Sequence, residues 1–208
     1  MSADFITVVS GLPRSGTSMM MQMLAAGGMP VISDGLRAPD ADNPRGYFEL
    51  EAVKKLKTES AWLAGARGHA VKIISMLLYD LPAAHEYRVV FMLRDMEEIL
   101  ASQEKMLKRR GTSDADSADA AMRWHFESHL KKVQAWLTEQ KNFRVLYCHH
   151  RELLDASAKQ IPRISKFLDV DLNEQAMGQA IEPLLHRNCL DDSAAARPLA
   201  PFLTPVGG

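Results

Sequence analysis

Blocks of apolar residues separated by polar stretches predict strands that alternate with helices along this chain. Short runs rich in β-branched residues are typical of buried strands. Four such runs lie at residues 5–9, 70–74, 87–93 and 143–147. Apolar residues spaced three or four positions apart predict helices. These stretches lie at residues 18–26, 48–63, 96–109, 119–139, 158–168 and 173–184. The alternation favours an α/β fold of three layers, α/β/α, with a mostly parallel central sheet.

The length of 208 residues suits one domain. We predict that this domain covers residues 1–190 and that residues 191–208, rich in alanine and proline, form a poorly ordered tail. Glycine, proline and aspartate predict a loop at residues 31–44, and small polar and acidic residues predict an exposed, mobile loop at residues 111–118. If the protein is an enzyme, the pocket for its second substrate would come from residues 31–48 and from the loop at residues 111–118.

Composition and charge narrow the range of partners. The chain is 47% hydrophobic and 25% charged, as in an average soluble domain, and its net charge of -1 offers no broad basic surface. No apolar run approaches the ~20 residues of a membrane helix. Two isolated cysteines, Cys148 and Cys189, form neither a disulfide framework nor a zinc site. We therefore expect a cytoplasmic protein that binds neither nucleic acid nor membranes.

The clearest chemical motif is a glycine-containing loop at residues 11–18, which read GLPRSGTS between the first predicted strand and the first predicted helix. The segment matches the P-loop pattern GxxxxGK[ST] except that Thr17 replaces the lysine. Glycines let the backbone wrap closely around an anion, while the start of the helix adds partial positive charge. Arg14 supplies a cation in place of the missing lysine. The loop therefore predicts a phosphate-binding site.

The missing lysine argues against an ordinary ATP or GTP enzyme, because that lysine bridges the β- and γ-phosphates. With this loop the sequence resembles the sulfotransferases that use 3′-phosphoadenosine 5′-phosphosulfate (PAPS). Their loop reads PKSGTT or PRSGT[ST], and residues 13–18 here read PRSGTS, more similar to the tyrosylprotein and bacterial branches than to the cytosolic enzymes. The resemblance implies that the 5′-phosphosulfate is held by Arg14, Ser15, Gly16, Thr17 and Ser18.

A second segment resembles the part of the same family that binds the 3′-phosphate. There, a strand leads into Arg-Asp/Asn-Pro, with a serine eight residues after the arginine. Here the strand at residues 87–93 leads into Arg94-Asp95-Met96, and Ser102 follows at the same spacing. The resemblance implies that Arg94 and Ser102 hold the 3′-phosphate, for which an arginine offers a fork of N–H donors. Met96 replaces a proline that starts the helix without touching the ligand.

Sulfuryl transfer requires an acceptor in line with the breaking bond, a base for its proton, and cations for the leaving phosphate oxygens. Arg14 is the predicted cation. By resemblance, Lys72 matches a lysine of the cytosolic enzymes, and Glu49 is the candidate base by comparison with other branches. Asp80 and His85 are weaker candidates for the base. No metal is required by this chemistry.

We therefore predict an enzyme that moves a sulfuryl group from PAPS, its co-substrate, to a hydroxyl or amine of an acceptor that the sequence does not identify. One alternative is a P-loop kinase or nucleotide hydrolase with Asp95 on Mg²⁺. Another is a nucleotide-binding module without catalysis, because Ile74 replaces the catalytic histidine of cytosolic enzymes and Met19 their adenine-stacking tryptophan. His125 and His129, four residues apart, are expected to belong to a packed or solvated helix face.

Overall fold

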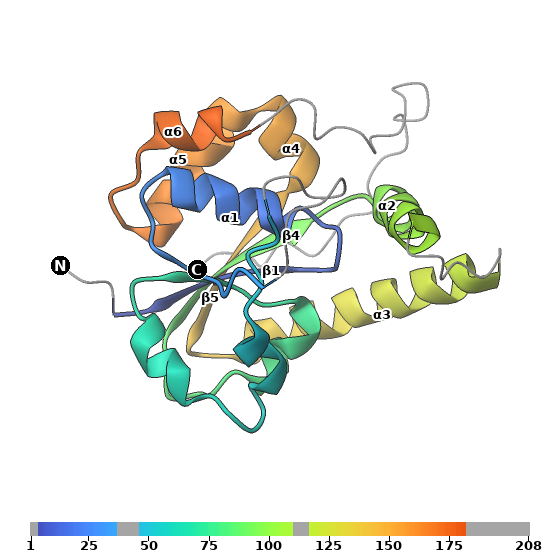
Figure 1. Cartoon of the computed structure of the whole chain (residues 1–208), viewed down its shortest axis with the longest axis horizontal. Coiled ribbons are helices and arrows are strands. Elements are labelled where there is room, and N and C mark those ends of the chain that lie inside the picture. The colour runs from blue at the N-terminus through green and yellow to red at the C-terminus, as the bar shows by residue number, and fades with distance from the viewer. Residues whose placement is uncertain (1–3, 37–45, 110–116, 182–208) are drawn as a thin grey trace.

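The computed structural model of this chain describes residues 4–36, 46–109 and 117–181. Its centre is a parallel sheet (Figure 1). The sheet has five strands in the order β2-β3-β1-β4-β5. The strands are β1 (Ile6–Gly11), β2 (Val31–Ile32), β3 (Ala70–Lys72), β4 (Tyr87–Leu93) and β5 (Phe143–His149). The predicted parallel sheet and its four main strands are confirmed. The short edge strand β2 lies where only a loop was expected.

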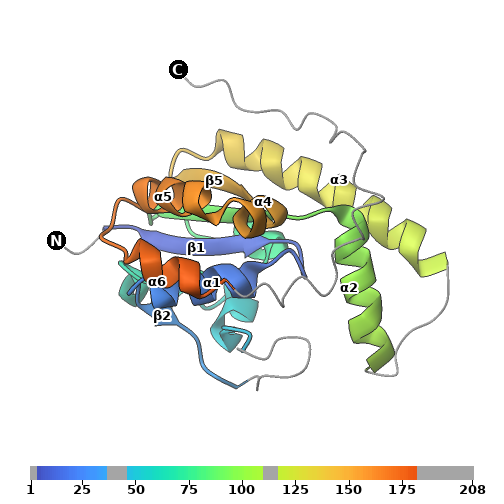
Figure 2. The same ribbon diagram turned by 90° about the horizontal axis from the view of Figure 1, so that it is seen from above.

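Helices cover both faces of the sheet, as the three-layer prediction requires (Figures 1 and 2). The α-helices are α1 (Thr17–Ala26), α2 (Met96–Arg109), α3 (Ser117–Glu139), α4 (His150–Asp155), α5 (Ser157–Leu168) and α6 (Glu174–Gln179). The core on one face is formed with α1, α5 and α6, and the core on the other face with α3 and the segments after β2. Each face of the sheet is thus buried by its own layer.

The single helix predicted over residues 48–63 is wrong. Two short 3-10 helices occupy this region, η1 (Glu51–Lys55) and η2 (Ala61–Ala66), and a third, η3 (Ser75–Asp80), follows β3. Of the apolar positions that the spacing picked out, Val53 and Leu56 are buried, and Leu50 and Trp62 pack against the core partly buried. Because two tight turns can bury the same apolar positions as one helix, the periodicity did not distinguish between them.

Other differences concern the carboxyl-terminal half. Helix α4 was not predicted, since its six residues are too few to show a periodic pattern. Ser117 and Ala118 belong to α3 instead of the preceding loop. Residues 110–116, most of the predicted mobile loop, and the predicted tail at 191–208 lie outside the described residues.

The parallel sheet places the ends of its strands along one edge. Gly11 pairs with Met92, and Leu93 pairs with His149, so the segments after β1, β4 and β5 leave the sheet side by side. Figure 2 shows α2 beyond the end toward which the β1 arrow points. Ligands of open parallel sheets bind at this carboxyl edge, and the predicted site residues gather there.

Candidate functional site

The loop at residues 11–18, called the phosphate loop below, joins β1 to α1 in the strand, loop and helix order that the motif predicts. Arg14 and Gly16 both have left-handed backbones, with φ of 69° and 99°. A Cβ atom on Gly16 would stand 2.6 Å from Cδ2 of the buried His150, so a side chain has no room there. Helix α1 has neither a capping side chain nor an acidic residue in its first turn. Its amino end therefore presents free N–H groups and partial positive charge to an anion.

The fold brings the two predicted nucleotide-binding segments into direct contact. Arg14 Nε donates a hydrogen bond of 2.8 Å to Ser102 Oγ, and Arg94 Nη1 donates one of 3.2 Å to the Arg14 carbonyl. The second bond spans 80 positions in the chain. Ser102 lies on α2 and is buried. The side chains assigned to the 5′- and 3′-ends of the nucleotide thus share one site, while their binding of a nucleotide stays a prediction.

Buried donors at this site lack partners. Arg94 Nε is bonded to Glu98 Oε2 at 2.7 Å, and the two side chains are only 8% and 3% exposed. Within the described part of the chain, neither Arg94 Nη2 nor Ser15 Oγ, both buried, has a hydrogen-bond partner. Buried polar atoms in folded proteins are almost always hydrogen-bonded. These atoms, together with the amino end of α1, are the donor set that phosphate oxygens would satisfy.

The predicted catalytic residues adjoin the same loop. Lys72, at the end of β3, places Nζ 3.3 Å from Ser18 Oγ and donates a 2.8 Å hydrogen bond to the Tyr47 carbonyl. Its Nζ lies 3.8 Å from Glu49 Oε1, and the Glu49 side chain is 34% exposed. Lys72 and Glu49 therefore form one charged pair beside the phosphate loop, open to solvent on the carboxylate side.

The weaker base candidates do not join this group. His85 precedes β4, its carbonyl accepts a hydrogen bond from Asn142, and its ring contacts Tyr87 at the first position of the strand. His85 is therefore at the opposite edge of the sheet from the loop, which rules it out as the base. Asp80 follows Tyr79, whose ring packs on Trp136, and Trp136 packs in turn on Phe143 at the first position of β5. Asp80 therefore leads into the same edge.

Asp95 has a structural task in α2. Its Oδ1 accepts hydrogen bonds from the backbone N–H groups of Glu97 and Glu98 at 2.8 and 3.3 Å. The carboxylate thus caps the first turn of the helix, a role typical of aspartate. The kinase alternative, which needs Asp95 on Mg²⁺, is not favoured.

The two spaced histidines of α3 serve separate contacts. His129 Nε2 lies 2.9 Å from the buried Ser75 Oγ, and burial lowers the pKa of His129. The exposed His125 ring packs edge-on against Trp124. In the described ranges, no three His, Cys, Asp or Glu side chains are grouped to hold a metal ion. None of the described helices is both long and apolar enough to cross a membrane.

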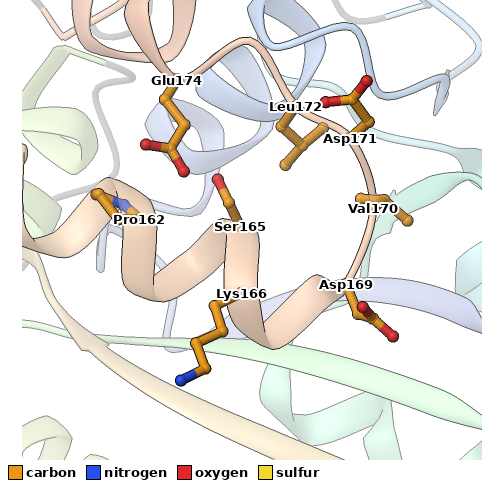
Figure 3. A pocket seen from close by; sticks show the side chains of 8 residues that line it. All are labelled: Pro162, Ser165, Lys166, Asp169, Val170, Asp171, Leu172 and Glu174. Atoms are coloured by element: carbon orange, nitrogen blue, oxygen red, sulfur yellow. The ribbon is translucent and has the colours of Figure 1, made fainter.

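A shallow pocket elsewhere is lined by the end of α5 and the loop to α6 (Figure 3). Asp169 on its rim lies 3.5 Å from Arg88, the second residue of β4. The pocket therefore belongs to the sheet edge opposite the phosphate loop. Figure 3 shows the Glu174 carboxylate turned toward Ser165, whereas Lys166 points away. This pocket is therefore not the predicted nucleotide site.

Of two residues that support the site, Glu98 was missed in the sequence and His150 was placed only at the correct edge of the sheet. Glu98 could have been noticed, because it lies in the first turn of the predicted helix and Arg94 precedes it by four positions, a spacing that favours ion pairs near a helix. His150 follows a predicted strand, so the sequence places it at the same edge of the sheet. Its contact with Gly16 could not be predicted, since that contact joins segments more than a hundred residues apart in the chain. Neither residue belongs to the motifs that the family resemblance supplied.

A comparison with known families matches residues 6–189 to the family model described as sulfotransferase domain. The chain therefore belongs to the sulfotransferase domain family, which confirms the predicted membership. No curated protein matches the sequence at a significant level.

Three solved structures show the same fold at low sequence identity. Mouse sulfotransferase SULT7A1, complexed with PAP, is 14% identical, with a TM-score of 0.57 over 86% of this chain and 62% of that chain. Retinol dehydratase, in complex with androsterone and inactive cofactor PAP, is 18% identical, with a TM-score of 0.53 over 86% of this chain and 63% of that chain. The sulfotransferase domain of the Synechococcus PCC 7002 olefin synthase is 14% identical, with a TM-score of 0.51 over 95% of this chain and 84% of that chain. The chain thus spans less than two thirds of the first two proteins.

Proposed function

We propose that this protein transfers a sulfuryl group from PAPS to a hydroxyl or amine of an acceptor. The observation that carries the proposal is the contact of Arg94 and Ser102 with the arginine of the phosphate loop. An enzyme acting on a linear triphosphate needs donors along one chain of phosphates, whereas PAPS carries phosphate at both ends of its ribose. Two groups of donors in one site match PAPS, with its two separate phosphate positions, better than they match a linear triphosphate. Complexes of mouse SULT7A1 and retinol dehydratase with PAP support this choice.

The nucleotide would lie across the carboxyl edge of β1 and β4. Its 5′-phosphosulfate would meet the loop residues Arg14, Ser15, Gly16, Thr17 and Ser18. Its 3′-phosphate would meet Arg94 and Ser102. The unpartnered Arg94 Nη2 and Ser15 Oγ would each gain a phosphate oxygen as acceptor. A charge-assisted bond of this kind is about twice as strong as a neutral one.

The transfer forms a bond from the acceptor oxygen or nitrogen to sulfur while the bond from sulfur to the 5′-phosphate oxygen breaks. The acceptor proton would pass to Glu49, and the pair of electrons would leave with the phosphate of 3′-phosphoadenosine 5′-phosphate (PAP). Lys72, 3.8 Å from Glu49 Oε1, would offset charge on the sulfuryl oxygens. Arg14 would stabilise the leaving phosphate, since cations held at the site of developing charge lower the barrier. No metal takes part in this scheme.

The same proposal includes the setting of the enzyme. A cytoplasmic location fits the sparse cysteines, of which Cys148 is a buried free thiol. Neither nucleic acid nor membrane is needed as a partner. The acceptor would enter beside Glu49, the more exposed member of the charged pair.

Calorimetric titration with PAP and with ATP–Mg²⁺ tests the nucleotide site. We expect clear binding of PAP, weak binding of ATP–Mg²⁺, and loss of PAP binding in Arg94→Ala. Arg67→Ala is the matched control, because Arg67 pairs with Asp4 on the surface. Binding of ATP–Mg²⁺ with no effect of the 3′-phosphate would refute the sulfotransferase site.

Turnover needs a separate test. The wild-type protein is incubated with PAPS and a panel of hydroxyl and amine acceptors, and released PAP is measured. We expect turnover that Glu49→Gln abolishes while PAP affinity is kept. Tight PAP binding without turnover on any acceptor would favour the module that has lost catalysis.

A further inference from the structure

Glu98 is the one acidic side chain among the described residues that is both buried and bonded to the proposed nucleotide site. Its carboxylate accepts the 2.7 Å hydrogen bond from Arg94 Nε, and both side chains lie below one tenth exposed. The family motif assigns no role to this position. An isolated buried charge is strongly unfavourable, so each partner needs the other in the absence of ligand.

The geometry divides the donors of Arg94 among three directions. Nε is committed to Glu98, and Nη1 donates to the Arg14 carbonyl of the phosphate loop. Nη2, buried and without a partner among the described residues, is the donor left over. Because the guanidinium is planar and rigid, fixing Nε and Nη1 also fixes where Nη2 points.

We propose that Glu98 is a positioning residue that orients Arg94 so that its free Nη2 meets the 3′-phosphate of the nucleotide. This inference rests on the proposed function, because it assumes a ligand that carries that phosphate. Glu98 itself makes no contact with the phosphate, which a carboxylate would repel. The hydrogen-bond acceptor matters for this role, and the negative charge does not.

The test is the preference for the 3′-phosphate, measured as the ratio of the dissociation constants of AMP and PAP by calorimetry. Glu98→Ala removes the acceptor and should lower this ratio about tenfold or more, the size of a lost hydrogen bond to a charged group. Glu98→Gln keeps an acceptor oxygen at nearly the same place and should keep the ratio within about threefold, which is less than that bond is worth. A general loss of stability would weaken both nucleotides alike and leave the ratio unchanged.

Two further variants complete the design. Glu98→Asp keeps the charge but shortens the side chain, so it should lower the ratio even if Glu98→Ala fails to fold. Glu97→Ala is the matched control, because Glu97 is exposed and pairs with Arg123 on α3. It should leave the ratio unchanged.

The outcomes separate the inference from the proposed function. An unchanged ratio in Glu98→Ala and Glu98→Asp, or an equal loss in Glu98→Gln, would overturn the positioning role. Equal affinity of the wild-type protein for AMP and PAP would refute the proposed function, and the inference with it. A reduced ratio in the alanine and aspartate variants, restored by glutamine, would support both.

Discussion

Replacement of Gly16 by alanine tests whether the phosphate loop is held in place by the residue beneath it. Gly16 has φ of 99°, a conformation that residues with a Cβ atom rarely adopt. The added Cβ would also stand 2.6 Å from Cδ2 of His150, whose ring is buried. Since a buried ring has little room to rotate away, we expect the loop itself to move.

Two contributions set the size of the effect. The left-handed backbone costs about 1–2 kcal/mol for a residue other than glycine. Overpacking against the buried ring adds about 1–3 kcal/mol. We therefore expect Gly16→Ala to lower the free energy of unfolding by about 2–5 kcal/mol. Displaced N–H groups should also weaken PAP binding by about tenfold or more, the worth of one charge-assisted hydrogen bond.

Gly28 provides the matched control. Its φ is 93°, close to that of Gly16, yet a Cβ atom there would meet nothing within 4 Å. Gly28→Ala therefore carries only the backbone contribution. In urea unfolding, the two variants should differ by about 1–3 kcal/mol, which is roughly 0.5–1.5 M in midpoint at a slope of about 2 kcal/mol/M.

A double substitution identifies the cause of that difference. In a His150→Ala background the steric part is removed, so Gly16→Ala should cost less by about 1 kcal/mol or more. Equal losses for Gly16→Ala and Gly28→Ala would refute the reasoning. Full additivity of Gly16→Ala and His150→Ala would refute it as well.

Three further predictions concern the rest of the molecule. Burial raises the pKa of the Cys148 thiol to about 12. In a Cys189→Ser variant, iodoacetamide at pH 8 should therefore label the protein only after unfolding. Rapid labelling of the folded protein, detected by mass spectrometry, would contradict this prediction. Burial, aided by Lys132, lowers the pKa of His129, so the unfolded state binds more protons once the pH falls below about 6.5 and stability drops there. His129→Gln should flatten the fall in urea midpoint from pH 7 to pH 5, and an unchanged fall would count against the assignment. Arg88 donates to the Phe167 and Leu168 carbonyls and stacks 3.9 Å from the Phe5 ring centroid. Arg88→Ala should therefore lower the free energy of unfolding by about 2–4 kcal/mol. Arg144 is exposed at the paired position of β5, so Arg144→Ala should lower it by under about 0.5 kcal/mol, and similar losses in the two variants would contradict the prediction.

The sequence by itself determined the main strands of the sheet and the two motifs that are predicted to bind a nucleotide. Buried parallel strands leave runs of β-branched and apolar residues, and a loop that wraps a phosphate needs glycines and a cation at set positions. Both are local requirements, so the segment at 87–93 and the loop at 11–18 could be recognised from neighbouring residues alone. The spacing of Arg94 and Ser102 is local in the same way, because Arg94 stands two residues before α2 and Ser102 lies on that helix.

Only the tertiary structure decided what these segments do together. The bonds from Arg94 to the Arg14 carbonyl and from Arg14 to Ser102 form because parallel pairing of β1 and β4 aligns their carboxyl ends. The contact of His150 with Gly16 likewise depends on β5 lying beside β4. The helix predicted over residues 48–63 was wrong because the apolar spacing there fits an α-helix and two 3-10 turns equally well. Local patterns record which side chains are buried, whereas strand order and packing decide which of them meet.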